Sequence, residues 1–353
     1  MRLHRSSDDT LATLFQPLAD GLLDWPAEGG ALFLRARDGA ELRQAPRPGL
    51  ICEQEFKPAA DALAQAGWHT VDLASLDPAR RFALVLLLPP RQRQEARALF
   101  AQAVARCAPG GRVLASMRND EGARSGEDDL ARLAGGVSNL SRRKCRVFWT
   151  EPLQGPADAA LAGEWADLDA PRPILGGRFT SRPGVFAWDR ADPASALLAA
   201  HLPSDLSGRA ADLGAGYGYL SAELLARCPQ VTALDLYEAQ SRALAMARIN
   251  LRSARLPPEF FWHDVTAGLP RRYDSIVSNP PFHAQGGEDR PDIGRRFIAV
   301  AAQSLNPGGR FWMVANRHLP YEQALDECFG EVRSVAQDGG FKVVEARKPR
   351  LRA

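Results

Sequence analysis

The feature that most constrains the fold of this 353-residue chain is an internal repeat. The decapeptide at 81–90, RFALVLLLPP, aligns without a gap with RYDSIVSNPP at 272–281. A second match follows at 108–112 and 306–310, which read APGGR and NPGGR. Self-similarity within a chain indicates duplicated structural units. We therefore predict two copies of one fold, in agreement with the two domains expected of a chain of this length.

Each copy alternates short apolar runs with helical patterns. In the first half we expect strands at 31–34, 50–52, 68–73, 82–88, 112–116 and 147–149, and helices at 8–25, 58–66, 92–107 and 128–134. In the second half we expect strands at 209–213, 231–235, 260–263, 275–278, 311–315, 332–337 and 341–346, and helices at 219–227, 239–251, 295–304 and 321–328. This alternation predicts the α/β class, with a mostly parallel sheet and helices on both of its faces.

The composition excludes several other classes of protein. Hydrophobic residues make up 45% of the chain and charged residues 24%, which is typical of globular proteins, and the net charge is +2. The longest apolar run, 83–88, is too short to cross a bilayer. The five cysteines have neither the spacing of a zinc site nor that of a disulfide framework. We expect a reduced, cytoplasmic protein with no bound metal and no membrane partner.

The clearest ligand-binding pattern in the second half is the turn DLGAGYG at 212–218. Its glycines let the backbone approach a ligand and open the N-terminus of a helix toward it. Tyr219 stands where a dinucleotide fingerprint needs its last glycine, and Asp212 suits a cationic ligand better than a phosphate. S-adenosylmethionine meets both conditions. We expect Asp235, at the end of the next strand, on the ribose hydroxyls, and Asp264-Val265 at the adenine amine.

The fourth strand of this half ends at the corner Asn279-Pro280-Pro281-Phe282. The two prolines stop the strand and hold the asparagine extended. The Asn279 amide oxygen and the Pro280 carbonyl can then accept the two protons of an exocyclic amine, and Phe282 can stack on a flat base. A strand that simply ends in a proline-rich turn is the alternative interpretation.

The first copy lacks these groups. Leu88 stands where the second copy has Asn279, and leucine cannot orient an amine. The turn after 50–52 contains Glu53 and Glu55 and no glycine, so we expect no cofactor to bind in this half.

The composition shifts between 150 and 177 toward alanine, proline, glycine and acids, which indicates a linker. We predict a first domain over 1–155, a linker over 156–171 and a catalytic domain over 172–353. The first domain also contains a basic run, Arg142, Arg143, Lys144 and Arg146, which is either a solvated face or a contact for RNA phosphates.

The second half resembles the class I, Rossmann-like S-adenosylmethionine-dependent methyltransferases, and the whole chain resembles the ribosomal RNA small-subunit methyltransferase C family. The motifs that carry the resemblance are 183–186 (PGVF) with Asp192, 212–218, 274–283, 314–316 (VAN), 319–321 (LPY) and 341–343 (FKV). Ala187-Trp188 depart from the Ser-Arg that family members commonly show. The resemblance implies two tandem Rossmann-like methyltransferase domains, each with a seven-stranded, mostly parallel sheet. The N-terminal copy would be degenerate and would support folding or RNA binding.

The same resemblance implies the reaction and its residues. A monomer would transfer a methyl group from S-adenosylmethionine to N2 of a guanine in 16S ribosomal RNA, in the 30S subunit or its precursor. Asn279, Pro280, Pro281 and Phe282 would be catalytic. The cofactor would contact Asp212, Gly214, Ala215, Gly216, Gly218, Asp235, Leu236, Asp264, Val265 and Asn279. RNA would contact His283, Asn316, Lys342, Arg142, Arg143, Lys144 and Arg146, and His283 is also a candidate proton relay.

Three alternatives stay open at this point. A protein glutamine amide needs the same two acceptors as a guanine amine, although enzymes for it usually have tyrosine in place of Phe282. A guanine in large-subunit ribosomal RNA is a further substrate of the same chemistry. A non-catalytic RNA-binding or assembly protein is the alternative from a different class. The residues that argue against it are the intact Asp212, Gly214, Asp235 and Asn279.

Overall fold

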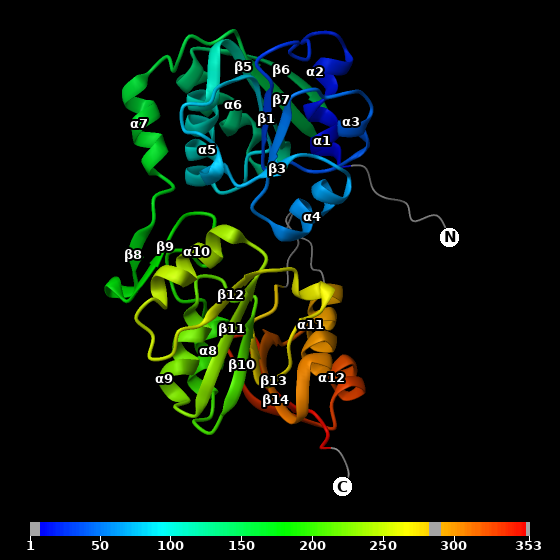
Figure 1. Cartoon of the computed structure of the whole chain (residues 1–353), viewed down its shortest axis with the longest axis vertical. Coiled ribbons are helices and arrows are strands. Elements are labelled where there is room, and N and C mark those ends of the chain that lie inside the picture. Colours follow the sequence, from blue (N-terminus) through cyan, green and yellow to red (C-terminus); the bar gives the residue numbers. More distant parts are fainter. Residues whose placement is uncertain (1–7, 282–290, 351–353) are drawn as a thin grey trace. The chain divides into compact units, whose positions relative to one another are not determined.

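The computed structural model describes residues 8–281 and 291–350. The chain divides into two compact units, Met1–Ala170 and Pro171–Ala353 (Figure 1). Within the described residues no helix has the length and apolar character needed to span a membrane. Phe282 and His283 lie outside the described residues.

The first unit is built on one seven-stranded sheet in the order β3-β2-β1-β4-β5-β7-β6. The central strands are parallel, and β7 and β6 form an antiparallel edge. The strands are β1 (Ala31–Leu34), β2 (Leu50–Glu53), β3 (Thr70–Val71), β4 (Phe82–Leu87), β5 (Cys107–Arg118), β6 (Val137–Arg142) and β7 (Cys145–Thr150). The helices are α1 (Asp9–Leu14), α2 (Gln16–Ala19), α3 (Ala40–Arg43), α4 (Lys57–Gln65), α5 (Arg93–Arg106), α6 (Ala123–Ala134) and α7 (Ala159–Asp167).

The second unit repeats this sheet in the order β12-β11-β10-β13-β14-β16-β15. Its strands are β10 (Gly208–Leu213), β11 (Val231–Glu238), β12 (Glu259–Trp262), β13 (Tyr273–Ser278), β14 (Leu305–Asn316), β15 (Glu331–Asp338) and β16 (Phe341–Arg347). A short hairpin of β8 (Arg172–Ile174) and β9 (Phe179–Ser181) precedes it. The helices are α8 (Pro193–His201), α9 (Tyr219–Arg227), α10 (Ser241–Asn250), α11 (Pro291–Ser304) and α12 (Glu322–Cys328).

Apolar side chains alternate across each sheet and form a core on each face. In the first unit α5, α6 and α7 cover one face and α1, α3 and α4 the other. In the second unit α8, α9 and α10 cover one face and α11 and α12 the other. The predicted α/β class with helices on both faces of a mostly parallel sheet is therefore confirmed for both units.

The internal repeat extends to the register of the strands. In the first sheet Phe82 opposes Cys107, but the register then shifts and Leu84 opposes Arg112. The aligned residues of the second sheet form the equivalent pairs, Tyr273–Leu305 and Ser275–Arg310, with the same shift. The Pro-Gly-Gly elements cause it, because Gly110 and Gly308 take φ values of 79° and 80°, which favour glycine.

Several boundaries differ from the sequence prediction. The helix expected over 8–25 is two short helices, α1 and α2, and Pro17 lies in the first turn of the second, where proline is tolerated. Strand β6 and helices α3, α7 and α8 were not predicted. The linker predicted over 156–171 is wrong over α7, since Trp165 is 1% exposed in the core of the first unit and the Arg97 guanidinium lies 4.9 Å from its ring centroid.

Candidate functional site

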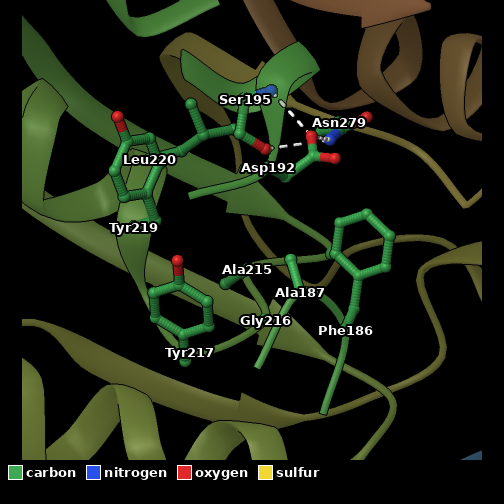
Figure 2. A pocket seen from close by; sticks show the side chains of 11 residues that line it. Phe186, Ala187, Asp192, Ser195, Ala215, Gly216, Tyr217, Tyr219, Leu220 and Asn279 are labelled. Atoms are coloured by element: carbon green, nitrogen blue, oxygen red, sulfur yellow. Dashed lines mark hydrogen bonds between the residues drawn. The ribbon is translucent and has the colours of Figure 1, made fainter. Parts of the chain in front are cut away.

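A pocket lies at the carboxyl ends of β10 and β13 in the second unit, where open α/β sheets bind their ligands. Its wall combines the loop after β10, the first turn of α8 and the corner at Asn279 (Figure 2). Phe186 stands at this pocket with 66% of its surface exposed. An ideal Cβ on Gly214 would lie 3.8 Å from the main-chain oxygen of Asn279, so the predicted loop and the predicted corner meet here.

The glycine-rich loop forms because its backbone needs conformations that glycine favours. Gly214, Gly216 and Gly218 have φ values of 77°, 56° and 90°. Gly218 also lies against α10, since a Cβ there would come within 3.3 Å of Ala247. Helix α9 begins directly after the loop, so its N-terminus opens toward the pocket as the spacing predicted.

Asp212 lies behind this loop and does not line the pocket. The side chain is fully buried, and Oδ2 accepts a hydrogen bond from the Ser221 hydroxyl of α9 at 2.7 Å. Oδ1 has no hydrogen-bond partner in the described part of the chain. Burial raises the pKa of this carboxyl to about 7.

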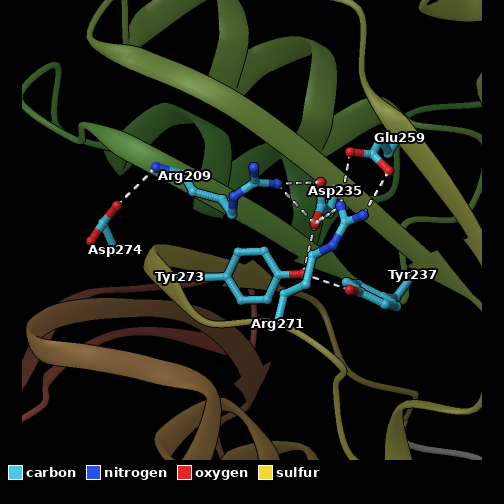
Figure 3. A network of polar contacts seen from close by, with 7 residues as sticks. All are labelled: Arg209, Asp235, Tyr237, Glu259, Arg271, Tyr273 and Asp274. Atoms are coloured by element: carbon cyan, nitrogen blue, oxygen red, sulfur yellow. Dashed lines mark hydrogen bonds and ion pairs between the residues drawn. The ribbon is translucent and has the colours of Figure 1, made fainter.

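Asp235 is not at the end of its strand, and the prediction that it meets the ribose is wrong. Strand β11 continues three residues beyond it to Glu238, and Asp235 is 1% exposed. Its Oδ2 accepts hydrogen bonds from Tyr273 Oη at 2.8 Å and Arg271 Nη1 at 3.0 Å, and Arg209 lies on the other side at 3.3 Å (Figure 3). Arg209 lies at the amino end of β10, and Arg271 and Tyr273 lie at the amino end of β13, whereas the pocket lies at the carboxyl ends of these strands.

Glu238 occupies the position that was assigned to Asp235. It ends β11, where its two carboxylate oxygens accept the backbone N–H of Gly216 and of Gln240, each at 2.8 Å. Burial raises the pKa of Glu238 and these hydrogen bonds oppose the rise. The pairing of β10 with β11 explains this placement, because Leu213, the last residue of β10, opposes Tyr237 and Glu238 follows directly.

The remaining predicted cofactor residues have mixed placements. Asp264 follows β12 and caps the short helix η4 (Val265–Ala267), accepting Thr266 N at 2.8 Å. Val265 is buried at 3% exposure. Leu236 is fully buried in the core of the sheet, so only its backbone could reach a ligand. Gly214, Ala215 and Gly216 line the pocket.

The corner presents Asn279 with its amide already oriented. The side-chain Nδ2 donates to Asp192 Oδ2 and to Ser195 Oγ, each at 2.9 Å (Figure 2). The amide oxygen, Oδ1, has no hydrogen-bond partner among the described residues. Pro280 is buried and Pro281 is exposed. The amide oxygen is thus the group left to accept a hydrogen bond, as an amine substrate requires.

Some of the residues predicted to contact RNA are buried or ion-paired within the protein, and others are exposed. Lys342 is 5% exposed and donates to the Leu319 carbonyl at 2.8 Å, so its prediction as an RNA contact is wrong. Arg146 is half-buried and ion-paired with Glu127. Arg142, Arg143 and Lys144 are exposed at the turn between β6 and β7, and Asn316 ends β14, the strand beside β13.

The first unit carries a different loop at the equivalent position. The strand equivalent to β10 is β1, since Leu34 opposes Leu87 as Leu213 opposes Ser278. The equivalent of the glycine-rich loop is therefore RARDG at 35–39 and not the turn after 50–52 that the sequence indicated. Arg35 and Arg37 replace the first two glycines.

No cluster of three or more metal-binding side chains occurs among residues 8–281 and 291–350. The polar side chains at or beside the pocket include the Asn279 amide and the carboxyl groups of Asp192, Asp212 and Glu238, which suit an organic ligand with a positive charge.

Comparison with known proteins agrees with this geometry. The family model described as Methyltransferase small domain matches residues 176–345. Curated relatives include ribosomal RNA small subunit methyltransferase C of Pseudomonas paraeruginosa, 31% identical over 316 residues that cover 83% of this chain and 93% of the relative. The same protein of Shewanella pealeana is 31% identical over 267 residues, covering 74% of this chain and 76% of the relative.

A solved structure matches nearly the whole chain. It is the 16S rRNA N2 G1207 methyltransferase of T. thermophilus in complex with AdoMet and guanosine, with a TM-score of 0.79, 25% identity, and coverage of 98% of this chain and 93% of that one. The duplicated sheet, the glycine-rich loop, the oriented asparagine and these matches lead to one conclusion. The chain belongs to the ribosomal RNA small subunit methyltransferase C family.

Proposed function

We propose that this protein transfers a methyl group from S-adenosylmethionine to the exocyclic N2 amine of a guanine in 16S ribosomal RNA. The observation that carries the proposal is the orientation of the Asn279 amide, whose nitrogen is bonded to Asp192 and Ser195 and whose oxygen is left as an acceptor. The relative with the matching structure is itself a guanine-N2 methyltransferase of 16S rRNA, which supports the choice of substrate.

The residues around the pocket fit S-adenosylmethionine. Gly214 and Gly216 leave the backbone open to a ligand, and Glu238 stands beside them as the acceptor for ribose hydroxyls. Asp212 adds a buried carboxylate behind the loop, and Asp264 stands after the next strand for the adenine amine. When bound, the cofactor supplies an electrophilic methyl group on a sulfonium centre.

The protein's part in the reaction is to hold the amine. The lone pair of a guanine amine is delocalised into the ring, so the amine is a weak nucleophile. Asn279 Oδ1 and the Pro280 carbonyl would accept its two protons and fix the nitrogen in line with the methyl group. The target guanine must leave its stack to reach this corner. The proton is lost after the new N–C bond forms, so no strong general base is required.

The same proposal assigns the remaining predicted roles. Phe282 would stack on the target base, and His283 and Asn316 would contact RNA next to it. The first unit would support folding or bind RNA through Arg142, Arg143 and Lys144, which are exposed. We propose that the protein acts as a monomer in the cytoplasm on the 30S subunit or its precursor.

The test is methylation in vitro followed by mapping of the product. Purified protein is incubated with labelled S-adenosylmethionine and 30S subunits from a strain that lacks the enzyme, and modified nucleotides are located by mass spectrometry. A single N2-methylguanine in 16S rRNA is expected. Label in 23S rRNA or in a protein glutamine instead would overturn the proposed substrate.

A further inference from the structure

We infer that Asp192 is a positioning residue for the methyl transfer, which fixes the amide of Asn279 so that its oxygen faces the substrate amine. The inference rests on the proposed function and adds to it a residue 87 positions away in the sequence from the one that it controls. The contact joins α8 to the end of β13.

The chemistry of the contact decides which way the amide points. An ionised carboxylate has only acceptor atoms, so it can bond to the Nδ2 side of an asparagine and not to the Oδ1 side. Asp192 Oδ2 accepts Asn279 Nδ2 at 2.9 Å, and Ser195 Oγ gives a second acceptor at 2.9 Å. A flipped amide would place its oxygen against the carboxylate and its two N–H donors toward the substrate. Donors cannot hold an amine that itself needs acceptors.

Asp192 is held rigidly enough for this task. It is the N-cap of α8, where its Oδ2 also accepts the backbone N–H of Ser195 at 2.8 Å. Pro193 is the first residue of the helix, a position at which its ring is compatible with the backbone. Ala194 and Leu198 are 1% and 0% exposed, so the first turns of α8 are anchored in the core.

Capping alone does not explain these contacts. An N-cap needs one acceptor for the Ser195 N–H, which serine supplies about as well as aspartate. The two hydrogen bonds that the Asn279 amide nitrogen donates are additional to the cap. The amide oxygen of Asn279, Oδ1, stays buried with no partner among the described residues. An unsatisfied buried acceptor is unfavourable, and a substrate amine would satisfy it on binding.

The test separates capping from positioning. Asp192→Ser keeps the cap and removes the acceptor that reaches Asn279. We expect its kcat on 30S subunits to fall by roughly 10- to 100-fold, consistent with the loss of one preorganised polar group, while its melting temperature and its cofactor Kd change little. Asp158→Ser is the matched control, because Asp158 caps the nine-residue α7 in the first unit. It should leave kcat unchanged.

A second pair of variants tests the polarity of the contact. Asn279→Asp places two carboxylates against each other and should lose activity. Adding Asp192→Asn should raise kcat at least tenfold above that of the Asn279→Asp enzyme. The amide introduced at position 192 donates to one oxygen of the carboxylate introduced at position 279, and the other oxygen of that carboxylate remains as an acceptor. No rescue, or an Asp192→Ser enzyme with wild-type kcat, would overturn the inference.

One readout does not depend on the reaction. In protein labelled with 15N-asparagine, the side-chain NH2 of Asn279 should exchange slowly with solvent in the wild type and faster in Asp192→Ser. Equal exchange in both would overturn the inference even if guanine methylation is confirmed. Protection without methylation of guanine N2 would instead leave the positioning contact intact and overturn the proposed substrate.

Discussion

The loop after β1 and the loop after β10 stand at the same place in two sheets of one topology, but different residues build them. In the second unit the first position is Gly214, with φ 77°, and in the first unit it is Arg35, with φ 54°. The left-handed conformation is therefore kept where glycine has been lost, at a cost of about 1–2 kcal/mol. Local interactions offset it, since Arg35 N donates to Glu53 at 2.9 Å and its guanidinium pairs with Glu95 at 2.8 Å.

The comparison shows which residues the fold requires and which the site requires. Both units keep the Pro-Pro strand end, the Pro-Gly-Gly turn and the same register shift. The second unit alone has glycine at the first and third positions of the loop, where the first unit has Arg35 and Arg37. It also has an amide at the corner and the hydrogen bond from Asn279 to Asp192 that orients this amide. The sheet is therefore independent of the site, and substitutions that exchange the two units' residues should affect function without loss of folding.

The largest effect is expected from Asn279→Leu, which gives the second unit the residue of the first. Leucine at the equivalent position, Leu88, is accommodated at 2% exposure, so the variant should fold. It should bind S-adenosylmethionine normally and lose on the order of 10²-fold or more in turnover, because the acceptor is gone. Single-turnover methylation and calorimetry measure the two quantities. Wild-type turnover would show that the corner is only structural.

The next effect distinguishes the two acids of β11. Glu238→Ala should weaken cofactor binding by roughly 1.5–3 kcal/mol, the range for hydrogen bonds to a charged group, with little change in stability. Asp235→Ala should do the reverse, because it removes the acceptor that Tyr273 Oη, Arg209 and Arg271 share. We expect about 1–3 kcal/mol of destabilisation, since Arg271 keeps its ion pair with Glu259 and both guanidinium groups are more than a third exposed. Calorimetry and chemical denaturation together resolve the two. Weakened cofactor binding in the folded Asp235 variant would restore the original assignment.

A smaller effect concerns pH and one buried position of β10. Asp212 is equivalent to the buried Phe33 of the first unit, since Phe33 opposes Leu86 as Asp212 opposes Val277. Burial raises the pKa of Asp212 to about 7, from 3.8, so the folded chain binds more protons than the unfolded chain between these values. Its contribution therefore makes the second unit less stable as pH rises from about 4 to 7.

Asp212→Asn tests that sign. It should flatten the decrease in melting temperature over this range, because an amide does not titrate between pH 4 and 7. Glu238, whose pKa burial also raises, contributes in the same direction and stays in place in this variant. Scanning calorimetry from pH 4 to 8 measures the slope, and identical slopes in variant and wild type would contradict the assignment.

The sequence was most informative where the two copies could be compared. The decapeptide alignment predicted the duplicated sheet, and the Pro-Gly-Gly match identified the position of the register shift. The glycine-rich loop and Asn279 were also found, because their residue types have few other uses at a strand end. Both belong to short, local patterns.

Longer-range features could not be read from the sequence. Asp235 and Glu238 are both acids in one strand, and only the pairing of β10 with β11 shows which reaches the edge. Lys342 is basic within a recognised motif, yet its amine turns inward to the Leu319 carbonyl. The hydrogen bond from Asn279 to Asp192 depends on the packing of α8 against the sheet, and no local sequence pattern predicts that packing.

The smallest effect concerns the turn between β6 and β7. Its two central residues, Arg143 and Lys144, have φ values of 51° and 57°, and the equivalent turn of the second unit, between β15 and β16, is Gly339-Gly340 at 55° and 86°. Glycine is preferred for this hairpin geometry. The double variant Arg143→Gly and Lys144→Gly should therefore raise the melting temperature slightly.

The same variant should weaken RNA binding, since it removes two exposed cations. If both contact phosphates, the slope of log Kd against log salt should fall by roughly 1.4–1.8, and affinity should decrease several-fold at low salt. Filter binding to 30S subunits at several salt concentrations measures the slope. A gain in stability with an unchanged slope would mean that these side chains form only a solvated face, and that the first unit uses another surface, or none, for RNA.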